Sequence, residues 1–316
     1  MKKTRIVVDA MGGDYAPQEV VKGAVEASGY IEDIEIVLVG QSKAVESELA
    51  DYTFDRAKIS IHPSEETINM DEDPVRAIRR KKDSSIVVGL NLVKSGQAVA
   101  FVSGGSTGAV TAAALLILGR KKGISRPALA ITFESPAGPI LLLDVGANAD
   151  CKPQHLVQFA QMGNIYMQKI FDVIHPRIGL LSSGEEEFKG NKLTRSTHQL
   201  LAKSGLNFVG NVEGQDLPKG GTDVVVTDGF TGNVVIKLGE GLGEVLAKLS
   251  SSAGNGNPFL MEAKRRVLNH TAGALLLGVN GNVIITHGAS DAVAIKQTII
   301  VAEHMVRQKV AEAIGI

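Results

Sequence analysis

Residues that could bind an anion follow one apolar run of the sequence. Ser103 to Gly108 come directly after the run at 98–102 and directly before an alanine- and leucine-rich stretch. Glycines let backbone N–H groups approach a ligand, and a helix N-terminus adds partial positive charge and unpaired donors. Hydroxyl groups would add donors suited to phosphate oxygens. The predicted phosphate-binding turn is Ser103, Gly104, Gly105, Ser106, Thr107 and Gly108.

A second turn of similar design follows the apolar run at 223–227. There Asp228, Thr231, Gly232 and Asn233 precede another helical pattern. Ordinary strand-to-helix turns also contain glycine, which relieves strain, and Ser or Thr, which caps the helix. Because two such turns occur in one chain, phosphate binding and simple capping both remain open for them.

Other polar residues follow further apolar runs. They are Asp9, Asn148 and His287. Ligands of doubly wound sheets bind beyond the carboxyl ends of the strands, so these side chains are candidates for the same site. An imidazole there can act as acid, base or donor, or it can simply be satisfied by backbone groups. Lys189 lies in the charged run 182–190, whose alternative interpretation is a solvated surface.

A basic cluster lies near the middle of the N-terminal half. Asp73 and the proline after it are typical of a helix start, and they place Arg76, Arg79 and Arg80 on one helical face. Clustered charge steers an acidic partner over a Debye length of about 8 Å. The cluster therefore predicts a docking surface, with a solvated face as the alternative.

Several kinds of chemistry are disfavoured by spacing. The sequence has neither G-x-x-x-x-G-K-[ST] nor G-x-G-x-x-G, and its seven histidines show no H-x-H or H-E-x-x-H spacing. We therefore predict no metal and no cofactor. We interpret Cys151, which follows the stretch GANAD at 146–150, as a structural thiol rather than a nucleophile. A net charge of −1 gives no indication of nucleic-acid binding.

The elements that must position these residues are visible as short apolar runs between amphipathic stretches. Continuous apolar strands are typical of a mainly parallel sheet covered by helices on both faces, so the predicted class is α/β. A stripe from Ile295 to Val310 predicts a last helix capped by Ser290 or Asp291. We predict one α/β domain over 1–316, with a helical excursion and flexible loop around 240–272, and loop or disorder at 250–259. The predicted strands lie in 5–10, 34–40, 98–103, 140–146, 177–182, 223–229 and 282–288.

The sequence also predicts a cytoplasmic location. The apolar run Gly108 to Gly119 is far shorter than the ~20 residues of a membrane-spanning helix. Asp9 interrupts the N-terminal apolar run too early for a secretory segment. A single cysteine fits a reducing compartment.

Six motifs together resemble one protein family. They are DAMGGD at 9–14, PVRAIRRKK at 74–82, LLDVGANAD at 142–150, GEEEFKG at 184–190, DGFTGNVVIK at 228–237 and HGAS at 287–290. In this order, and over nearly the whole chain, they are similar to the bacterial phosphate acyltransferases of phospholipid synthesis, the PlsX family.

The resemblance implies that a fatty acyl group moves from acyl carrier protein to inorganic phosphate, yielding acyl phosphate. It implies a homodimer with a three-layer α/β/α fold, similar to phosphotransacetylases and to isocitrate and isopropylmalate dehydrogenases. It also leaves open a peripheral contact with the membrane. The active-site residues that it implies are Lys189, Asp228, Asn233 and His287, with Asp9, Ser103 and Asn148 as weaker candidates.

Two departures from the family pattern matter. Family members usually read Ser-Ala-Gly-Asn-Thr-Gly at 103–108, so Ser106 replaces an amide with a shorter hydroxyl, which predicts altered activity or substrate preference. The region at about 250–270 is also shorter than the helix pair that family members commonly carry there.

The alternatives to this function are a phosphotransacetylase-like enzyme that uses acyl-coenzyme A, a non-catalytic phosphate- or acyl-binding protein, and, from the fold alone, an NAD-binding dehydrogenase.

Overall fold

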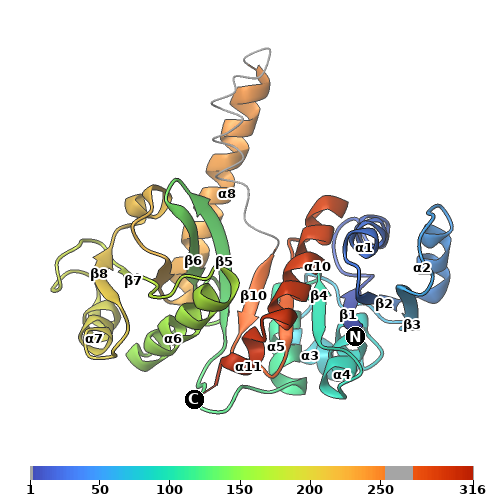
Figure 1. Ribbon diagram of the computed structural model, residues 1–316, viewed down its shortest axis with the longest axis horizontal. Helices are drawn as coiled ribbons and strands as arrows, with labels where there is room; N and C mark the ends of the chain where they lie inside the picture. The colour runs from blue at the N-terminus through green and yellow to red at the C-terminus, as the bar shows by residue number, and fades with distance from the viewer. Residues whose placement is uncertain (1–2, 253–272, 316) are drawn as a thin grey trace. The chain divides into compact units, whose positions relative to one another are not determined.

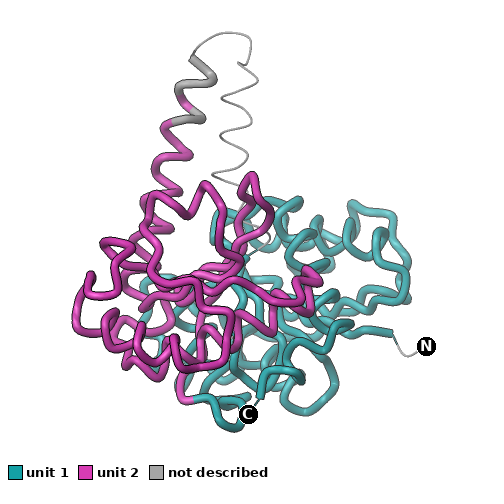
Figure 2. Tube along the Cα trace, turned by 60° about the vertical axis from the view of Figure 1, so that its left-hand side comes forward, with its two compact units in different colours: residues 1–124, 272–316 teal, residues 125–271 magenta. Residues whose placement is uncertain are grey.

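The computed structural model describes residues 3–252 and 273–315 (Figure 1). The chain forms two compact units, drawn in different colours in Figure 2. Unit 1 comprises Met1–Ile124 with Ala272–Ile316, and unit 2 comprises Ser125–Thr271. The assignment of 1–316 to one domain stays a prediction.

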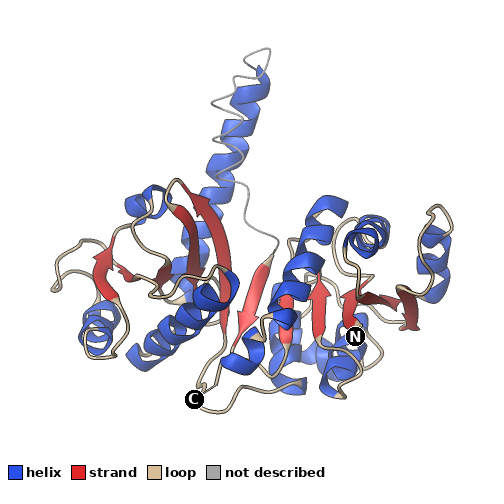
Figure 3. Ribbon diagram, viewed as in Figure 1, coloured by secondary structure: helices blue, strands red, loops and turns tan. Residues whose placement is uncertain are grey.

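The sheet of unit 1 is parallel except at one end. Its strands run in the order β3-β2-β1-β4-β11-β10, and only β10 and β11 pair antiparallel. Ile6 to Asp9 at the end of β1 are all buried, as expected for a strand covered on both faces. The strands are β1 (Thr4–Asp9), β2 (Ile34–Gly40), β3 (Ile59–Pro63), β4 (Ala100–Ser103), β10 (Ala274–Leu277) and β11 (Asn282–Ile285) (Figure 3).

The helices of unit 1 form two layers on its sheet. Helix α1 packs on α10, and both contact β1; α4 packs on α5, and α4 also contacts β1. Gly89 of α4 lies so close to the sheet that a side chain there would meet Phe101 of β4. The helices are α1 (Gln18–Tyr30), α2 (Ser42–Leu49), α3 (Pro74–Arg80), α4 (Ser85–Lys94), α5 (Thr107–Ile117), α10 (Ala292–Arg307) and α11 (Val310–Ala313).

Unit 2 has strand order β5-β6-β9-β7-β8, in which β5 and β6 form an antiparallel hairpin and the other pairs are parallel. Helix α6 packs on α7, with α6 over β6 and β9 and α7 over β7 and β8. Its elements are β5 (Ala128–Ser135), β6 (Gly138–Leu143), α6 (Pro153–Ile170), β7 (Ile178–Leu181), α7 (Lys192–Leu201), β8 (Phe208–Val212), the short 3-10 helix η1 (Gly214–Lys219), β9 (Val224–Val226) and α8 (Gly229–Ser252).

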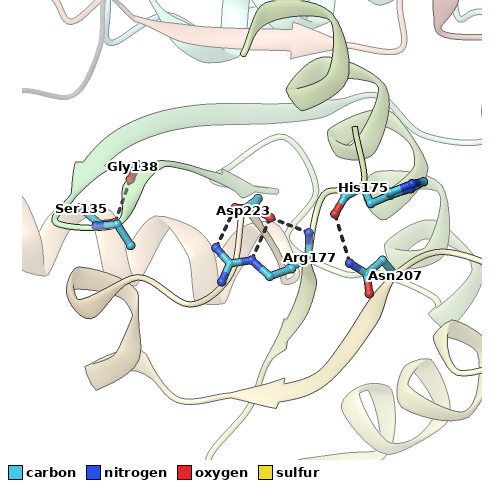
Figure 4. A network of polar contacts seen from close by, with 7 residues as sticks. Ser135, Gly138, His175, Arg177, Asn207 and Asp223 are labelled. Carbon is cyan, nitrogen blue, oxygen red and sulfur yellow. Dashed lines mark hydrogen bonds and ion pairs between the residues drawn. The ribbon is translucent and has the colours of Figure 1, made fainter. Parts of the chain in front are cut away.

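An ion pair joins the starts of β7 and β9 (Figure 4). Asp223 accepts hydrogen bonds from the Arg177 backbone N–H at 2.7 Å, from Nε at 3.1 Å and from Nη2 at 2.9 Å. Burial alone would raise the pKa of Asp223, but the hydrogen bonds from Arg177 lower it, and the same bonds raise the pKa of Arg177. The pair fixes the register of these strands at the end opposite to the predicted site residues.

The α/β class is confirmed, and each of the seven predicted strand runs contains a strand. Both predicted helix caps are also confirmed: Asp73 accepts from the Arg76 N–H at 2.8 Å, and Asp291 accepts from the Ala294 N–H at 2.9 Å. The prediction of loop from residue 250 is wrong for 250–252, because α8 continues to Ser252. The rest of the predicted loop, 253–272, lies outside the described residues.

Candidate functional site

Asp9 is the centre of the first cluster of predicted site residues, in unit 1. It ends β1, is buried, and accepts from the Ser103 hydroxyl at 2.6 Å and from the Met11 N–H at 3.1 Å. Ser103 Oγ in turn accepts from the Gly105 N–H at 3.0 Å. Burial raises the pKa of Asp9, and the hydrogen bonds from Ser103 and other groups offset only part of that rise. Ser103 and Gly105 therefore shape the turn, since their donors already have acceptors.

The donors left for a ligand lie at the start of α5. Ser106 is its N-cap and accepts from the Ala109 N–H at 3.4 Å. The backbone N–H groups of Thr107 and Gly108 have no acceptor within the described residues, as expected for the first turn of a helix. Both residues are exposed. This turn thus presents N–H groups at a helix N-terminus whose cap is neutral, which suits an anion.

Glycine is required in this turn because other backbone passes close by. A side chain at Gly12 would lie 2.7 Å from the Gly105 nitrogen, and one at Gly104 would lie 2.8 Å from the Gly12 oxygen. Atoms this close leave no room for a Cβ. The motif at 9–14 and the turn at 103–108 therefore form one structure.

His287 follows β11, which pairs in parallel with β4. Its side chain is exposed, and its Nδ1 accepts from the Ala289 N–H at 3.1 Å. Because Nδ1 accepts, the proton of the neutral ring is on Nε2. The predicted alternative was a ring whose nitrogens are satisfied by backbone groups. This is true of Nδ1. Nε2 carries the proton and is a donor.

Asp144 is the centre of the second cluster, in unit 2. It follows β6, is fully buried, and accepts from the N–H groups of Leu129, Gly146, Ala147 and Asn148 at 2.8–3.1 Å. The Asn148 amide nitrogen donates to Asp144 and to the Pro127 oxygen, at 2.8 and 2.7 Å. Burial raises the pKa of Asp144 despite these donors. Both donors of the Asn148 amide already have acceptors, so this side chain orients Asp144.

Asp228 caps α8 with a carboxylate. It accepts from the Thr231 N–H at 2.9 Å and from the Thr231 hydroxyl at 2.8 Å, and its backbone oxygen accepts from the Gly232 N–H at 2.9 Å. Thr231 and Gly232, both predicted to bind phosphate, therefore donate to Asp228 instead of presenting open donors. Asn233 is exposed, and a side chain at Gly146 would lie 3.9 Å from its amide.

A pocket of about 470 Å³ opens beside Asp228 and Thr231. This volume falls within the range of small-molecule sites, about 300–1,000 Å³. Its lining combines alkyl side chains with hydroxyls and one carboxylate, and it includes no lysine or arginine. The lining residues are Leu156, Leu181, Ser182, Ser183, Gly190, Asn191, Leu193, Thr194, Gly214, Thr227, Asp228, Thr231 and Val235.

Lys189 directly precedes Gly190, which lines this pocket. Lys189 is exposed, and its own side chain is not part of the lining. Its stem lies over Gly184, where a side chain would be 2.9 Å from Lys189 Cγ. The structure thus divides the predicted residues: Asp9, 103–108 and His287 belong to unit 1, and Asn148, Lys189 and 228–233 to unit 2. Their convergence on one site stays a prediction.

Comparison with known proteins identifies the family. Residues 4–313 match the family described as "Fatty acid synthesis protein". The chain is also 49% identical over 320 residues to the phosphate acyltransferase of Halothermothrix orenii, a match that covers 97% of this chain and 96% of that protein. The chain belongs to the PlsX family of phosphate acyltransferases. It is therefore an acyltransferase, as the six motifs predicted.

Two solved structures show the fold. A phosphotransacetylase from Streptococcus pyogenes superposes with a TM-score of 0.67 at 20% identity, covering 97% of this chain and 94% of its own. An isocitrate dehydrogenase from Methylococcus capsulatus superposes with a TM-score of 0.50 at 8% identity, covering 98% and 87%. The three-layer α/β/α fold with a mainly parallel sheet is thereby confirmed.

The three arginines that were predicted to form a docking surface lie at the surface of this family member. Arg76, Arg79 and Arg80 of α3 are all exposed. Cys151 is half-buried, and burial with the nearby Asp144 carboxylate raises the pKa of its thiol to about 12, which does not suit a nucleophile.

No group of three or more His, Cys, Asp or Glu suited to a metal occurs within 3–252 and 273–315. None of the helices in the described part of the chain has the length and apolar character needed to span a bilayer.

Sequence reasoning missed several residues that line the unit 2 pocket. Thr194 and Thr227 line the pocket, and Asn191 both lines it and caps α7. Thr227 directly precedes the predicted Asp228, so its place at a strand end was a signal that could have been used. Asn191 and Thr194 begin a helix rather than end a strand, and nothing in their local sequence distinguishes a pocket-lining cap from an ordinary one.

Proposed function

We propose that this enzyme transfers a fatty acyl group from acyl carrier protein to inorganic phosphate and so forms acyl phosphate. The relative named phosphate acyltransferase, which matches nearly the whole chain, supports the reaction. The observation that carries the proposal in the structure is the start of α5, where exposed N–H groups of Thr107 and Gly108 follow the neutral cap Ser106. A helix start of this kind favours an oxyanion.

Phosphate needs positioning more than activation. It carries negative charge at neutral pH, so the enzyme does not have to generate a nucleophile but has to desolvate and align it. We assign this task to the turn at 104–108 together with the Lys189 ammonium. Attack of a phosphate oxygen on the thioester carbonyl carbon breaks the carbon–sulfur bond directly, without a covalent enzyme intermediate, and the released thiolate takes up a proton.

The unit 2 pocket suits the uncharged acyl thioester better than phosphate. Its alkyl side chains Leu156, Leu181, Leu193 and Val235 can bury a hydrocarbon chain, whereas the Asp228 carboxylate would repel an anion. The carbonyl oxygen gains negative charge during attack, and a hydrogen-bond donor there stabilises it. The Asn233 amide and the His287 Nε2–H are the candidates for that donor.

The test is direct. The enzyme is incubated with long-chain acyl carrier protein and phosphate, and hydroxylamine traps acyl phosphate as the hydroxamate. We expect a hydroxamate that depends on phosphate and does not form when sulfate replaces it. Lack of product would overturn the proposal and leave a non-catalytic binding protein. Faster turnover with acyl-coenzyme A would favour the phosphotransacetylase-like alternative, and binding of NAD in a parallel titration would favour a dehydrogenase.

The carrier protein is proposed to dock on α3. Arg76, Arg79 and Arg80 are exposed there, and opposite charge speeds association at low salt. Arg79→Glu with Arg80→Glu should raise the KM for acyl carrier protein several-fold in low salt, and the effect should shrink as salt screens it. Arg56→Glu, an exposed arginine outside α3, is the control. A KM with unchanged salt dependence would reject this surface.

We also propose a cytoplasmic homodimer that can contact the membrane surface. Exposed apolar side chains recur every four residues along α8, at Phe230, Val234, Leu238 and Leu242, and such a row favours a protein or lipid contact. Analytical ultracentrifugation should give twice the monomer mass. Sedimentation with anionic vesicles tests the membrane contact, which fails if the enzyme stays in the supernatant.

A further inference from the structure

A buried amide holds the loop that carries Lys189. This loop connects β7 to α7 and has no regular secondary structure. Asn211 of β8 is only 6% exposed, and its Nδ2 donates to the Glu186 oxygen at 2.9 Å. The same oxygen accepts from the Lys189 N–H at 3.0 Å. One side chain from a neighbouring strand therefore fixes the turn immediately before Lys189.

His198 of α7 orients that amide. Its Nδ1 lies 3.0 Å from Asn211 Oδ1. Because Asn211 Nδ2 faces a carbonyl oxygen, Oδ1 must accept, so His198 carries a proton on Nδ1. The ring also packs edge-on against Phe208, with centroids 5.0 Å apart and planes at 79°. Three hydrogen bonds in sequence thus connect α7 to the Lys189 backbone.

A lysine needs such support more than most catalytic groups do. Its ammonium sits on a flexible four-carbon stem, so the position of the charge depends on what fixes the base of the stem. Here the Asn211 bond fixes the backbone, and Gly184 leaves the space over which the stem runs. Two apolar residues could fill the volume of Asn211 and His198 without the cost of burying polar groups, which favours a role beyond packing.

We propose that Asn211, oriented by His198, is a positioning residue for Lys189. This inference rests on the proposed function, in which Lys189 binds phosphate. Displacement of a catalytic group by about 1 Å can cost about 100-fold in rate. The loss of Asn211 should therefore impair the use of phosphate and leave binding of the acyl donor unchanged.

The experiment compares variants under saturating acyl carrier substrate. Asn211→Leu should lower kcat/KM for phosphate about 10- to 100-fold, with an unchanged KM for the acyl donor. His198→Leu should act in the same direction, and His198→Asn should restore activity because its amide nitrogen can replace Nδ1. The matched control is Asn282→Leu, since Asn282 is also a buried strand residue whose Nδ2 donates to a backbone oxygen, that of Val99 at 3.1 Å.

A double-mutant cycle separates positioning from packing. In a Lys189→Met background, Asn211→Leu should cost nothing further, because the group through which it acts is gone. An equal loss in both backgrounds, or wild-type kinetics in Asn211→Leu, would overturn the inference. If Asn211→Leu does not fold, or Lys189→Met is too slow to measure, equal loss in His198→Leu and His198→Asn overturns it. A wild-type enzyme that forms no acyl phosphate would instead refute the proposed function, and this inference with it.

Discussion

The starts of α5 and α8 have similar sequences and different chemistry. Each follows a buried strand, and each contains glycine and threonine in its first turn. At α5 the cap is Ser106, and the N–H groups of Thr107 and Gly108 stay without acceptors in the described structure. At α8 the cap is Asp228, which takes both donors of Thr231. The charge of one capping residue therefore distinguishes a helix start suited to an anion from one that supports an uncharged ligand.

The two buried carboxylates, Asp9 and Asp144, also differ in the kinds of hydrogen-bond donor that they accept from. Asp9 accepts from the hydroxyls of Ser103 and Ser85 and from the loop N–H groups of Met11 and Gly12. Asp144 accepts from four backbone N–H groups and the Asn148 amide, with no hydroxyl among these donors. A hydroxyl can turn and accept a hydrogen bond, but an N–H cannot. The Asp9 cluster can thus adapt to a neutral residue, and the Asp144 cluster cannot.

The largest expected effect is on the unit 2 side of this comparison, at Asn233. Asn233→Ala should lower kcat about 100- to 1,000-fold, the usual result of removing one oxyanion donor. The measurement is turnover at saturating phosphate and acyl donor. If the folded variant keeps near-normal turnover, Asn233 is not the donor, and His287 is the remaining candidate.

The next largest effect is on the free energy of unfolding, which should fall further in an Asp144 variant than in an Asp9 variant. Asp144→Asn should lower the free energy of unfolding by about 2–4 kcal/mol at neutral pH, because its amide must face backbone N–H groups. Asp9→Asn should cost about 1 kcal/mol, because the Ser103 hydroxyl can reverse. Urea unfolding measures both. Equal losses would show that the two clusters do not differ in adaptability.

The pH dependence of these two variants gives a second readout. Burial raises the pKa of both Asp9 and Asp144, so the folded state binds their protons more tightly than the unfolded state does. Their contribution to stability is present below the ordinary value of 3.8 and is lost as pH rises through the raised pKa. The difference in free energy of unfolding between the wild type and each Asn variant should therefore narrow as pH rises. A difference that widens would contradict the raised pKa values.

A smaller effect should follow from giving α5 the charge of α8. Ser106→Asp keeps a good helix cap but places a carboxylate beside the proposed phosphate site, so the KM for phosphate should rise about tenfold. Ser106→Asn, which introduces the residue that the resemblance gives as usual in the family, is the matched neutral control. Phosphate KM is measured for both at low and high salt. An unchanged KM in Ser106→Asp would place phosphate elsewhere.

The smallest effect is expected at Cys151, which lies beside the second cluster. Its Sγ donates to the Asn148 oxygen at 3.6 Å, and its pKa of about 12 leaves very little thiolate at pH 8. Cys151→Ser should keep turnover within about twofold of wild type. Iodoacetamide should label the folded enzyme far more slowly than the unfolded chain, as mass spectrometry can measure. Rapid labelling with loss of activity would reject the structural role of this thiol.

The sequence alone determined the class of the fold and its local boundaries. Buried runs such as 34–40 and 282–285 are strands whose apolar side chains are covered on both faces. Asp73 and Asp291 cap helices through contacts three residues away. Within the described residues, four strands were missed: β3, β5, β8 and β10. Polar residues interrupt the apolar pattern of β3 and β8. β5 forms a hairpin with β6, and only β6 had been recognised as an apolar run.

Only the tertiary structure decided which donors are open. Ser103 and Asp9 are 94 residues apart in the sequence, and their hydrogen bond removes a donor that the sequence had assigned to phosphate. Asn211 and Glu186 are 25 apart, and their bond revealed support for Lys189 that no motif contained. A residue's type and spacing limit what it can donate or accept, but folding brings distant groups together, and these partners decide which donors remain for a ligand.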